Sequence, residues 1–333
     1  MQNNTRVGSG AALGGHPAVL ITGVNGFVGQ CLSTVALQRG WRVTGAVRTA
    51  STCPAGVEPV VVGDIDDETK WAEALRGIDI VVHLAARVHV MKDNAADPLH
   101  EFRRVNLHGT TNLARQAARA GVKRLVYVSS IKVNGEETQG LRQYSDLDTP
   151  APQDPYAISK WEAEQALHRI AHETGLEVVI LRPPLMYGPG VKGNFASMLR
   201  VLGKSIPLPL ASVDNRRSLL YVGNFVSAIT ASAIHPVAAD QTYLVSDGED
   251  ISTPDLLRRV ATALGVSPRL FPFPRALLRL AGKLSGKSEQ IGRLLGSLRV
   301  DSDKIRRDLN WQPPYSLQQG LQATADWYRN TRP

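Results

Sequence analysis

Hydrophobic residues in the first half of the chain gather in short continuous runs, and stretches with helical spacing separate these runs. The apolar runs, rich in β-branched residues, lie at residues 18–23, 41–47, 57–64, 79–86, 124–130 and 177–188. The helical patterns lie at residues 27–39, 68–75, 99–120 and 156–174. Strands that are apolar throughout are buried on both faces, and their alternation with helices is typical of parallel sheets. The pattern predicts an α/β fold built on a doubly wound parallel (Rossmann) sheet.

The alternation loosens after about residue 188, where proline-rich turns and short helices replace it. We therefore expect residues 17–188 to form a Rossmann domain to which later segments return, and residues 189–333 to form mainly a smaller C-terminal α/β lobe that binds the substrate. Residues 1–16 lack the apolar stretch of a secretion signal, and we expect a flexible lead-in there.

Composition and charge narrow the class of protein. Of the 333 residues 43% are hydrophobic, which is enough for a large folded core. No uninterrupted run of about 18 apolar residues occurs, so no integral membrane segment is expected. Only Cys31 and Cys53 are present, which argues against a disulfide scaffold and favours a cytoplasmic location. The formal charge of +8 favours acidic partners. The sequence has no zinc-finger spacing and no aromatic–basic signature of RNA binding, so nucleic acid is not an expected partner. No metal site is expected either.

A glycine-rich turn follows the first predicted strand directly. The stretch "TGVNGFVG" places Gly23, Gly26 and Gly29 between that strand and the next helix. Glycine lets the backbone approach a pyrophosphate closely, and the N-terminus of the following helix offers unpaired N–H groups to it. The turn predicts that residues 17–188 bind NAD(P).

The choice of cofactor depends on the end of the second predicted strand. NAD-binding sheets usually present an acidic residue there to the ribose 2′-hydroxyl. Here the strand ends in Arg48 without a carboxylate, so NADP(H) is preferred and NAD(H) is the alternative, unless Arg48 is an ordinary surface arginine. Asp64, after the third strand, is either an acceptor for the adenine amino group or a helix cap.

Candidate catalytic residues lie on one strand end and one helix. Tyr156 and Lys160 are four residues apart and therefore share a helix face, while Ser130 ends the strand "RLVYVSS". An ammonium ~4 Å from a phenolate interacts with it by ~4 kcal/mol at an effective dielectric of ~20, which predicts a lowered tyrosine pKa. Tyr156 would then act as acid and base, and Ser130 would orient the substrate oxygen during hydride exchange. The alternative is that Tyr156 and Lys160 form only a surface pair.

In combination these motifs resemble the extended short-chain dehydrogenases/reductases, in the sugar-nucleotide branch that includes UDP-glucose 4-epimerase. The resemblance extends from Ala18 to about Trp327 and includes "HLAA", "NLHGTTNL", "YAISK", "LRPPLMYGPG", "RSLLYVGNF" and "DSDKIRRDLNW". It implies that Ser130, Tyr156 and Lys160 form the catalytic set. Beside Arg48 and Asp64, it implies cofactor contacts from Gly23, Asn25, Gly26, Phe27, Val28, Gly29, Ile65, Leu84, Ala85, Ala86, Asn106, Ser129, Tyr156, Lys160 and Pro183.

The same resemblance implies a UDP-sugar substrate and its contacts. Asn194 resembles the asparagine that contacts the UDP diphosphate, and Arg217 resembles an arginine that clamps a phosphate with its planar fork. Arg293 is either a second phosphate contact or a solvated helix arginine. Further substrate contacts are expected from Arg87, Ser130 and Lys132. A homodimer through the long helices at 99–120 and 156–174 is also expected from the family.

The reaction is inferred from departures within the family. Sugar 4,6-dehydratases carry an Asp-Glu pair where this chain has Ile131 and Lys132, so dehydration is not expected. Arg48 favours NADP(H), a cofactor that binds and leaves during turnover rather than staying bound as in an epimerase. It therefore favours a reaction with net oxidation or reduction of the substrate. The chain most resembles the UDP-N-acetylquinovosamine 4-dehydrogenases/reductases of bacterial O-antigen (lipopolysaccharide) synthesis, which reduce UDP-2-acetamido-2,6-dideoxy-D-xylo-hexos-4-ulose. A UDP-sugar (GlcNAc or Glc) 4-epimerase is the alternative, and a non-catalytic NADP(H)-binding regulatory protein is a remote one.

A basic, leucine-bearing segment at residues 275–299 permits two interpretations. It could associate with a membrane surface or cover the bound substrate. Its glycines weaken a long amphipathic helix, so covering the substrate is the preferred interpretation.

Overall fold

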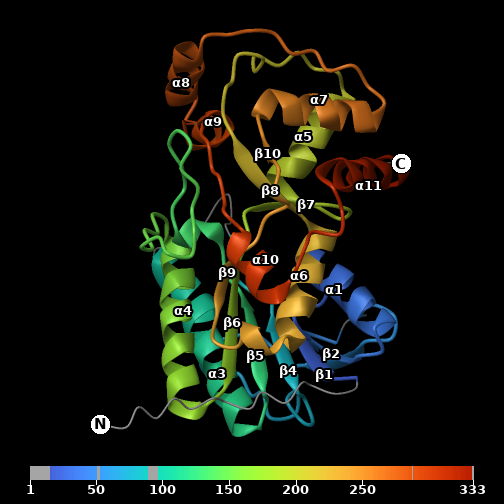
Figure 1. The fold of residues 1–333 in the computed structure, drawn as a ribbon, viewed down its shortest axis with the longest axis vertical. Helices are drawn as coiled ribbons and strands as arrows, with labels where there is room; N and C mark the ends of the chain where they lie inside the picture. Colours follow the sequence, from blue (N-terminus) through green and yellow to red (C-terminus); the bar gives the residue numbers. More distant parts are fainter. Residues whose placement is uncertain (1–15, 51–52, 89–96, 287, 332–333) are drawn as a thin grey trace.

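A parallel sheet of seven strands forms the centre of the computed structural model, which describes residues 16–50, 53–88, 97–286 and 288–331 (Figure 1). The strand order is β3-β2-β1-β4-β5-β6-β9, and every pairing in it is parallel. The strands are β1 (Ala18–Thr22), β2 (Arg42–Val47), β3 (Glu58–Val61), β4 (Ile80–His83), β5 (Arg124–Val128), β6 (Glu177–Arg182) and β9 (Thr242–Leu244). The predicted doubly wound Rossmann sheet is confirmed. The predicted lead-in, apart from His16, lies outside the described residues.

Helices cover both faces of this sheet because its strands are apolar on both sides. Val19 and Ile21 of β1 pack toward α1 (Phe27–Gln38) and α6 (Val222–Ile234), and Ala18 and Leu20 pack toward the opposite layer. That layer consists of α2 (Pro98–Arg103), a π-helical segment (Arg104–Gly109), α3 (Thr110–Arg119) and α4 (Pro155–Thr174). The strand order reverses between β1 and β4, and ligands of such sheets bind at the carboxyl ends of the strands there.

One predicted helix is absent among the described residues. Residues 68–75 form turns instead, because side chains of α3 take up their backbone groups. Gln116 accepts a hydrogen bond from the N–H of Trp71 (2.9 Å), and Asn112 donates one to the carbonyl of Thr69 (2.8 Å). The buried Trp71 anchors these turns to the core. The prediction of a helix at this place is wrong because tertiary hydrogen bonds replace the helical ones.

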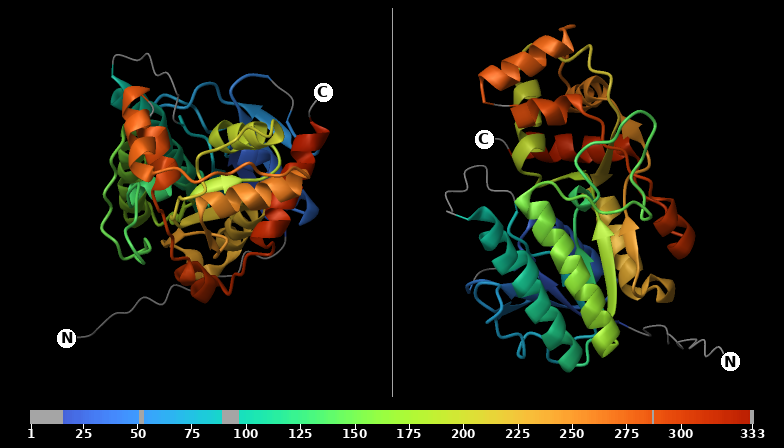
Figure 2. Two further views of the ribbon diagram at one scale, coloured as in Figure 1. Left: turned by 90° about the horizontal axis from the view of Figure 1, so that it is seen from above. Right: turned by 90° about the vertical axis from the view of Figure 1, so that its left-hand side faces the viewer.

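A smaller sheet of three strands organises the second lobe (Figure 2). The apolar run at 177–188 is split by Pro183 and Pro184, so that β7 (Leu185–Tyr187) joins β8 (Arg217–Tyr221) and β10 (Asp250–Ile251). The helices around it are α5 (Gly193–Gly203), α7 (Thr253–Leu264), α8 (Arg275–Leu284), α9 (Ser288–Leu295) and α11 (Leu317–Asn330), while α10 (Asp303–Leu309) packs near β9. Across the described ranges, no helix combines the length and the apolar character that spanning a bilayer requires.

Candidate active site

The turn between β1 and α1 forms a cradle that has no room for side chains. Gly23 has a φ of +69°, and a Cβ on Gly29 would lie 2.3 Å from the carbonyl oxygen of Gly23. Gly26 occupies the N-cap of α1 and has no side chain to accept from the first N–H groups of the helix. Those groups therefore have no side-chain cap. Asn25 beside them is exposed, and Phe27 and Val28 of the first turn are partly buried. This geometry fits the pyrophosphate of a dinucleotide.

The predicted cofactor-selecting residues form an ion pair. Arg48 Nε lies 2.9 Å from Asp64 Oδ1, and both side chains are exposed. The carboxylate missing at the end of β2 is therefore supplied from the end of β3. Ile65, the next residue, packs against Gly109 of the π-helical segment. The basic charge on which the NADP(H) preference depended is thus partly neutralised.

The segment after β4 is held against the glycine turn from two sides. The Thr22 hydroxyl accepts from the N–H groups of Leu84 and Ala85 (3.1 Å each), which places the Leu84 to Ala86 segment beside Gly23. Asn106 accepts from the N–H of Arg87 (2.9 Å) and donates to its carbonyl (3.0 Å). Asn106, predicted as a cofactor contact, therefore positions this loop. The Arg87 guanidinium lies over the Phe102 ring.

Ser130, Tyr156 and Lys160 come together at the carboxyl edge of the sheet. Ser130, just beyond β5, lies near Tyr156 at the start of α4, and its hydroxyl accepts from the N–H of Lys132 (3.2 Å). Lys160, one turn later, is 2% exposed, and its Nζ donates to the carbonyl of Val128 (2.8 Å). That Nζ lies 6.0 Å from the centroid of the Tyr156 ring. Neighbouring Ser129 is buried, and its hydroxyl has no partner among the described residues, so Ser130 is the serine that faces the tyrosine. The Pro183 carbonyl accepts from the N–H of Ile131 and fixes the serine segment to β6.

The ionisation of this cluster differs from the sequence-based expectation. Burial, together with the charge of Asp154, raises the pKa of Tyr156 to about 12, and the nearby Ser130 hydroxyl opposes this shift. Burial lowers the pKa of Lys160 to about 7, against the influence of Glu164. The predicted lowering of the Tyr156 pKa by Lys160 is therefore wrong for the protein without cofactor or substrate. The reason is that desolvation acts on both groups and leaves the lysine only partly charged at neutral pH.

Lys132, predicted as a substrate contact, is held between two carboxylates. Its Nζ donates to Glu136 (2.8 Å) and to Asp154. Asp154 also caps α4 by accepting from the N–H of Ala157 (2.7 Å). Although burial raises its pKa, the hydrogen bonds from Lys132 and Ala157 leave the pKa of Asp154 lowered. Asp154 was missed in the sequence, yet Asp followed by Pro is a recognisable helix start.

Two predicted phosphate ligands share a cavity of about 380 Å³. Arg217 Nη1 donates to the carbonyls of Arg293 (2.8 Å) and Gly296 (3.0 Å), which brings the arginines of β8 and α9 together. Burial and then the charge of Arg293 lower the pKa of Arg217. Asn194 lies exposed at the start of α5 and does not line this cavity. The complete lining is Glu136, Glu137, Gln139, Gln153, Arg217, Gly292, Arg293 and Gly296.

The chain is similar in sequence to known proteins. Residues 19–246 match the model of the NAD dependent epimerase/dehydratase family. A UDP-glucose 4-epimerase of Vibrio cholerae is 45% identical over 310 residues, which cover 92% of this chain and 94% of that protein. The N-acetyl-α-D-glucosaminyl-diphospho-ditrans,octacis-undecaprenol 4-epimerase of Escherichia coli O157:H7 is 26% identical, with 93% and 94% covered.

Solved structures share the whole fold. The Thermus thermophilus UDP-glucose 4-epimerase in complex with NAD superimposes with a TM-score of 0.76 at 27% identity, covering 95% of this chain and all of that one. MoeE5 in complex with UDP-glucuronic acid and NAD has a TM-score of 0.77 at 25% identity, with the same coverage.

Proposed function

This chain belongs to the NAD-dependent epimerase/dehydratase family, and we propose that it is a UDP-sugar 4-epimerase that uses NAD(H). The observation that carries the proposal is the convergence of Ser130, Tyr156 and the buried Lys160 at the sheet edge next to the glycine turn. The 45% identity to a UDP-glucose 4-epimerase supports the epimerase over the 4-ketoreductase that we favoured from the sequence.

The chain's own residues move and hold a proton at the sugar O4 atom. NAD(H), when bound at the glycine turn, exchanges a hydride with C4 of the sugar. Tyr156 accepts the O4 proton in the oxidation and returns it in the reduction, which takes place on the opposite face of C4. Ser130 donates a hydrogen bond to the same oxygen. Protonated Lys160 favours the tyrosinate by adding positive charge beside it.

The cavity between β8 and α9 provides a site for the UDP diphosphate. Arg217 uses one guanidinium nitrogen for two carbonyls, and an arginine has five N–H donors in total. Its other donors therefore can serve phosphate oxygens. Glu136 joins this cavity to the catalytic cluster through Lys132. The contact predicted for Asn194 stays a prediction, because it would need a substrate that extends beyond this cavity.

The Arg48–Asp64 pair supports NAD(H) as the cofactor. Asp64 brings an exposed carboxylate to the end of β2, where a ribose 2′-hydroxyl needs an acceptor. A 2′-phosphate would have to compete with that carboxylate for Arg48. The NADP(H) preference stays a prediction, and fluorescence titrations with NADH and NADPH compare the two affinities directly.

The 4-ketoreductase remains a second candidate because the residue that follows β2 is Arg48 rather than a carboxylate. The two candidates differ in cofactor consumption. An epimerase interconverts UDP-GlcNAc and UDP-GalNAc, or UDP-Glc and UDP-Gal, without net oxidation of NADH. A ketoreductase oxidises one NADPH or NADH for each molecule of UDP-2-acetamido-2,6-dideoxy-D-xylo-hexos-4-ulose. NMR of the sugar nucleotides together with absorbance at the reduced nicotinamide band distinguishes them.

Replacing Tyr156 by Phe tests the catalytic set under either reaction. We expect turnover to fall by about 10²–10⁴-fold, because the acid/base is removed, while cofactor binding is unchanged. Tyr315→Phe is the matched control, since Tyr315 is 46% exposed and lies outside the cluster. A Tyr156→Phe variant with full activity would exclude this assignment.

Biological context comes from the relatives. The E. coli relative acts on a sugar carried by undecaprenol diphosphate, which supports a role in surface polysaccharide (O-antigen) synthesis. We further propose a cytoplasmic homodimer through α3 and α4, which sedimentation velocity tests.

A further inference from the structure

Helix α8 presents a stripe of leucines to the outside of the second lobe. Leu277, Leu280 and Leu284 are 48%, 51% and 81% exposed, and their spacing of three and four residues places them on one face. Ala281 on the same face is also exposed. Figure 1 shows α8 at the upper left edge of the second lobe, away from the seven-stranded sheet.

The opposite face of α8 is firmly attached, so the leucines cannot simply turn inward. Leu278 is 7% exposed and belongs to the core of the second lobe. Gly282 lets α9 approach closely, because a Cβ on it would lie 3.3 Å from Ile291. The exposed leucine face is therefore a fixed feature of the fold.

Basic side chains run along the flank of this leucine face. Arg279 and Lys283 are exposed and four residues apart. At about 100° per residue, both lie on the side of the helix between the leucine face and the buried face. Within the described part of the chain neither has an acidic partner. The sequence of α8 itself, "RALLRLAGKL", contains no acidic residue.

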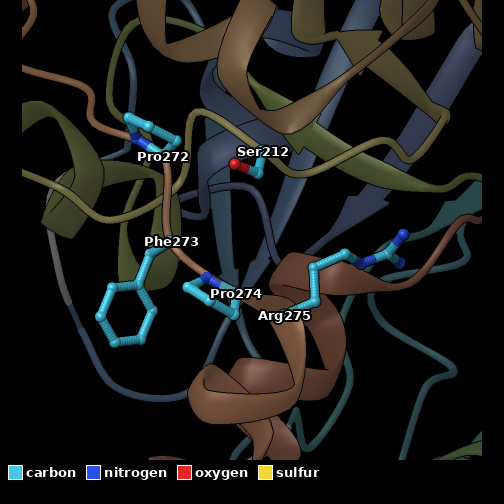
Figure 3. Close-up of a pocket in the computed structure, with 5 residues that line it drawn as sticks. All are labelled: Ser212, Pro272, Phe273, Pro274 and Arg275. Carbon is cyan, nitrogen blue, oxygen red and sulfur yellow. The ribbon is translucent and has the colours of Figure 1, made fainter.

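Apolar surface continues from α8 into the segment that leads to it. Phe271 is 42% exposed, and Pro272, Phe273, Pro274 and Arg275 line a cavity of about 390 Å³ opposite Ser212 (Figure 3). An apolar edge followed by a helix with leucines on one side and cations beside them is the pattern of a helix that lies in the surface of a bilayer.

The leucine face of α8 does not serve the cavity between β8 and α9. That cavity is lined by Gly292, Arg293 and Gly296 from this part of the chain, and by no residue of α8. The basic segment predicted to cover the substrate thus divides into two parts. Residues from α9 onward border the cavity, and α8 faces outward.

We propose that α8 docks this protein on a membrane surface rich in anionic lipid. Leu277, Leu280 and Leu284 enter the boundary between headgroups and acyl chains, and Arg279 and Lys283 meet the lipid phosphates. The leucines supply apolar burial and the cations supply charge complementarity, which a face meant for a purely apolar protein partner does not need. This proposal does not depend on the reaction proposed above.

Vesicle co-sedimentation tests the proposal with the full-length protein. The probes are phosphatidylcholine vesicles with and without phosphatidylglycerol, at an ionic strength of about 0.15 M. We expect binding to the anionic vesicles only. The triple variant Leu277→Gln, Leu280→Gln, Leu284→Gln should reduce the partition coefficient by about tenfold or more, because glutamine keeps the helix but loses the apolar burial.

Two further variants separate the contributions. Arg279→Gln with Lys283→Gln should reduce binding to the anionic vesicles and make it insensitive to salt. Leu141→Gln with Leu147→Gln is the matched control, since both leucines are 89% exposed but lie in the loop between β5 and α4. This control should bind as the wild type does.

Three outcomes would overturn the proposal. The first is wild-type protein that binds neither vesicle, and the second is a triple variant that binds as well as the wild type. The third is a triple variant that changes the sedimentation coefficient without lipid, because the leucine face would then join two copies of the chain. Thermal unfolding of each variant checks the fold, and activity on a water-soluble UDP-sugar should be unchanged in all of them.

Discussion

Two buried cations differ in their surroundings: Lys160 on helix α4, and Arg182 on β6, which pairs with Glu164 one turn further along α4. Arg182 of β6 is 4% exposed, and its guanidinium donates to both carboxylate oxygens of Glu164 at 3.0 and 2.5 Å, and to Asn134 at 3.0 Å. Lys160 is 2% exposed and donates to a backbone carbonyl, that of Val128. Arg182 and Lys160 are thus buried to a similar degree. Arg182 has a complete ion pair, whereas Lys160 has no carboxylate partner of its own.

The difference separates a structural role from a chemical one. The Arg182–Glu164 pair balances its charge and connects β6 to α4. Lys160 has no such balance, and burial lowers its pKa to about 7. A group whose pKa lies near neutral pH can change its charge during a reaction, so an unpaired buried cation beside a tyrosine indicates a catalytic site.

Lys160→Met should give the largest effect and should affect activity rather than stability. We expect turnover to fall by about 10²–10⁴-fold, because the cation that favours the tyrosinate is lost. The free energy of unfolding near pH 7 should not decrease, since methionine avoids the desolvation of a charge. Steady-state kinetics and urea unfolding measure the two effects. A strongly destabilised Lys160→Met variant would contradict the conclusion that Lys160 has a chemical role rather than a structural one.

Lys160→Met should also change how the stability of the protein depends on pH. The pKa of Lys160 is lowered from 10.5 to about 7, so unfolding takes up a proton between these values. The contribution of Lys160 to the free energy of unfolding therefore decreases as the pH is lowered from 10.5 toward 7. Below pH 7 this contribution no longer changes with pH. Lys160→Met should remove that slope. Lys123→Met, at a side chain that is 60% exposed, is the control.

Arg182→Met should show the opposite behaviour. It leaves Glu164, which is 0% exposed, as an unpaired buried carboxylate, and the unfolding free energy should fall by about 3–5 kcal/mol. Turnover per folded molecule should change much less. Arg115→Met, from a half-exposed pair with Glu173, should cost less than about 1 kcal/mol. The double variant Arg182→Met, Glu164→Leu should recover most of the loss, and a failure to do so would show that the pair is not the cause.

Lys132→Met should give the smallest effect. Without this cation the charge of Asp154 acts more strongly on Tyr156, whose pKa it already raises. Turnover at neutral pH should fall by about tenfold and recover as the pH is raised, since one pKa unit is a factor of ten in ionised tyrosine. Lys132→Arg keeps the charge and should restore activity. A change in KM with an unchanged pH profile would instead identify Lys132 as the substrate contact predicted from the sequence.

Local patterns in the sequence were enough to predict much of the fold and the centre of the site. The parallel sheet follows from continuous β-branched strands, and the glycine turn follows from its place between a strand and a helix. Tyr156 and Lys160 share a face because four residues make about one helical turn. The predicted helix at 68–75 failed because Asn112 and Gln116, more than 40 residues away, take its backbone hydrogen bonds.

The sequence by itself therefore determined most of the order of strands and helices, the glycine turn and the identity of the catalytic candidates, since these depend on spacing within one or two neighbouring elements. Only the tertiary structure decided which groups are charged and paired. The Arg48–Asp64 and Lys132–Asp154 pairs join different segments, and the direction of the Tyr156 and Lys160 pKa shifts depends on burial by the whole fold. The outward face of α8 is likewise set by its packing on α9. Electrostatics and exposure are properties of the surroundings in space, which no spacing along the chain contains.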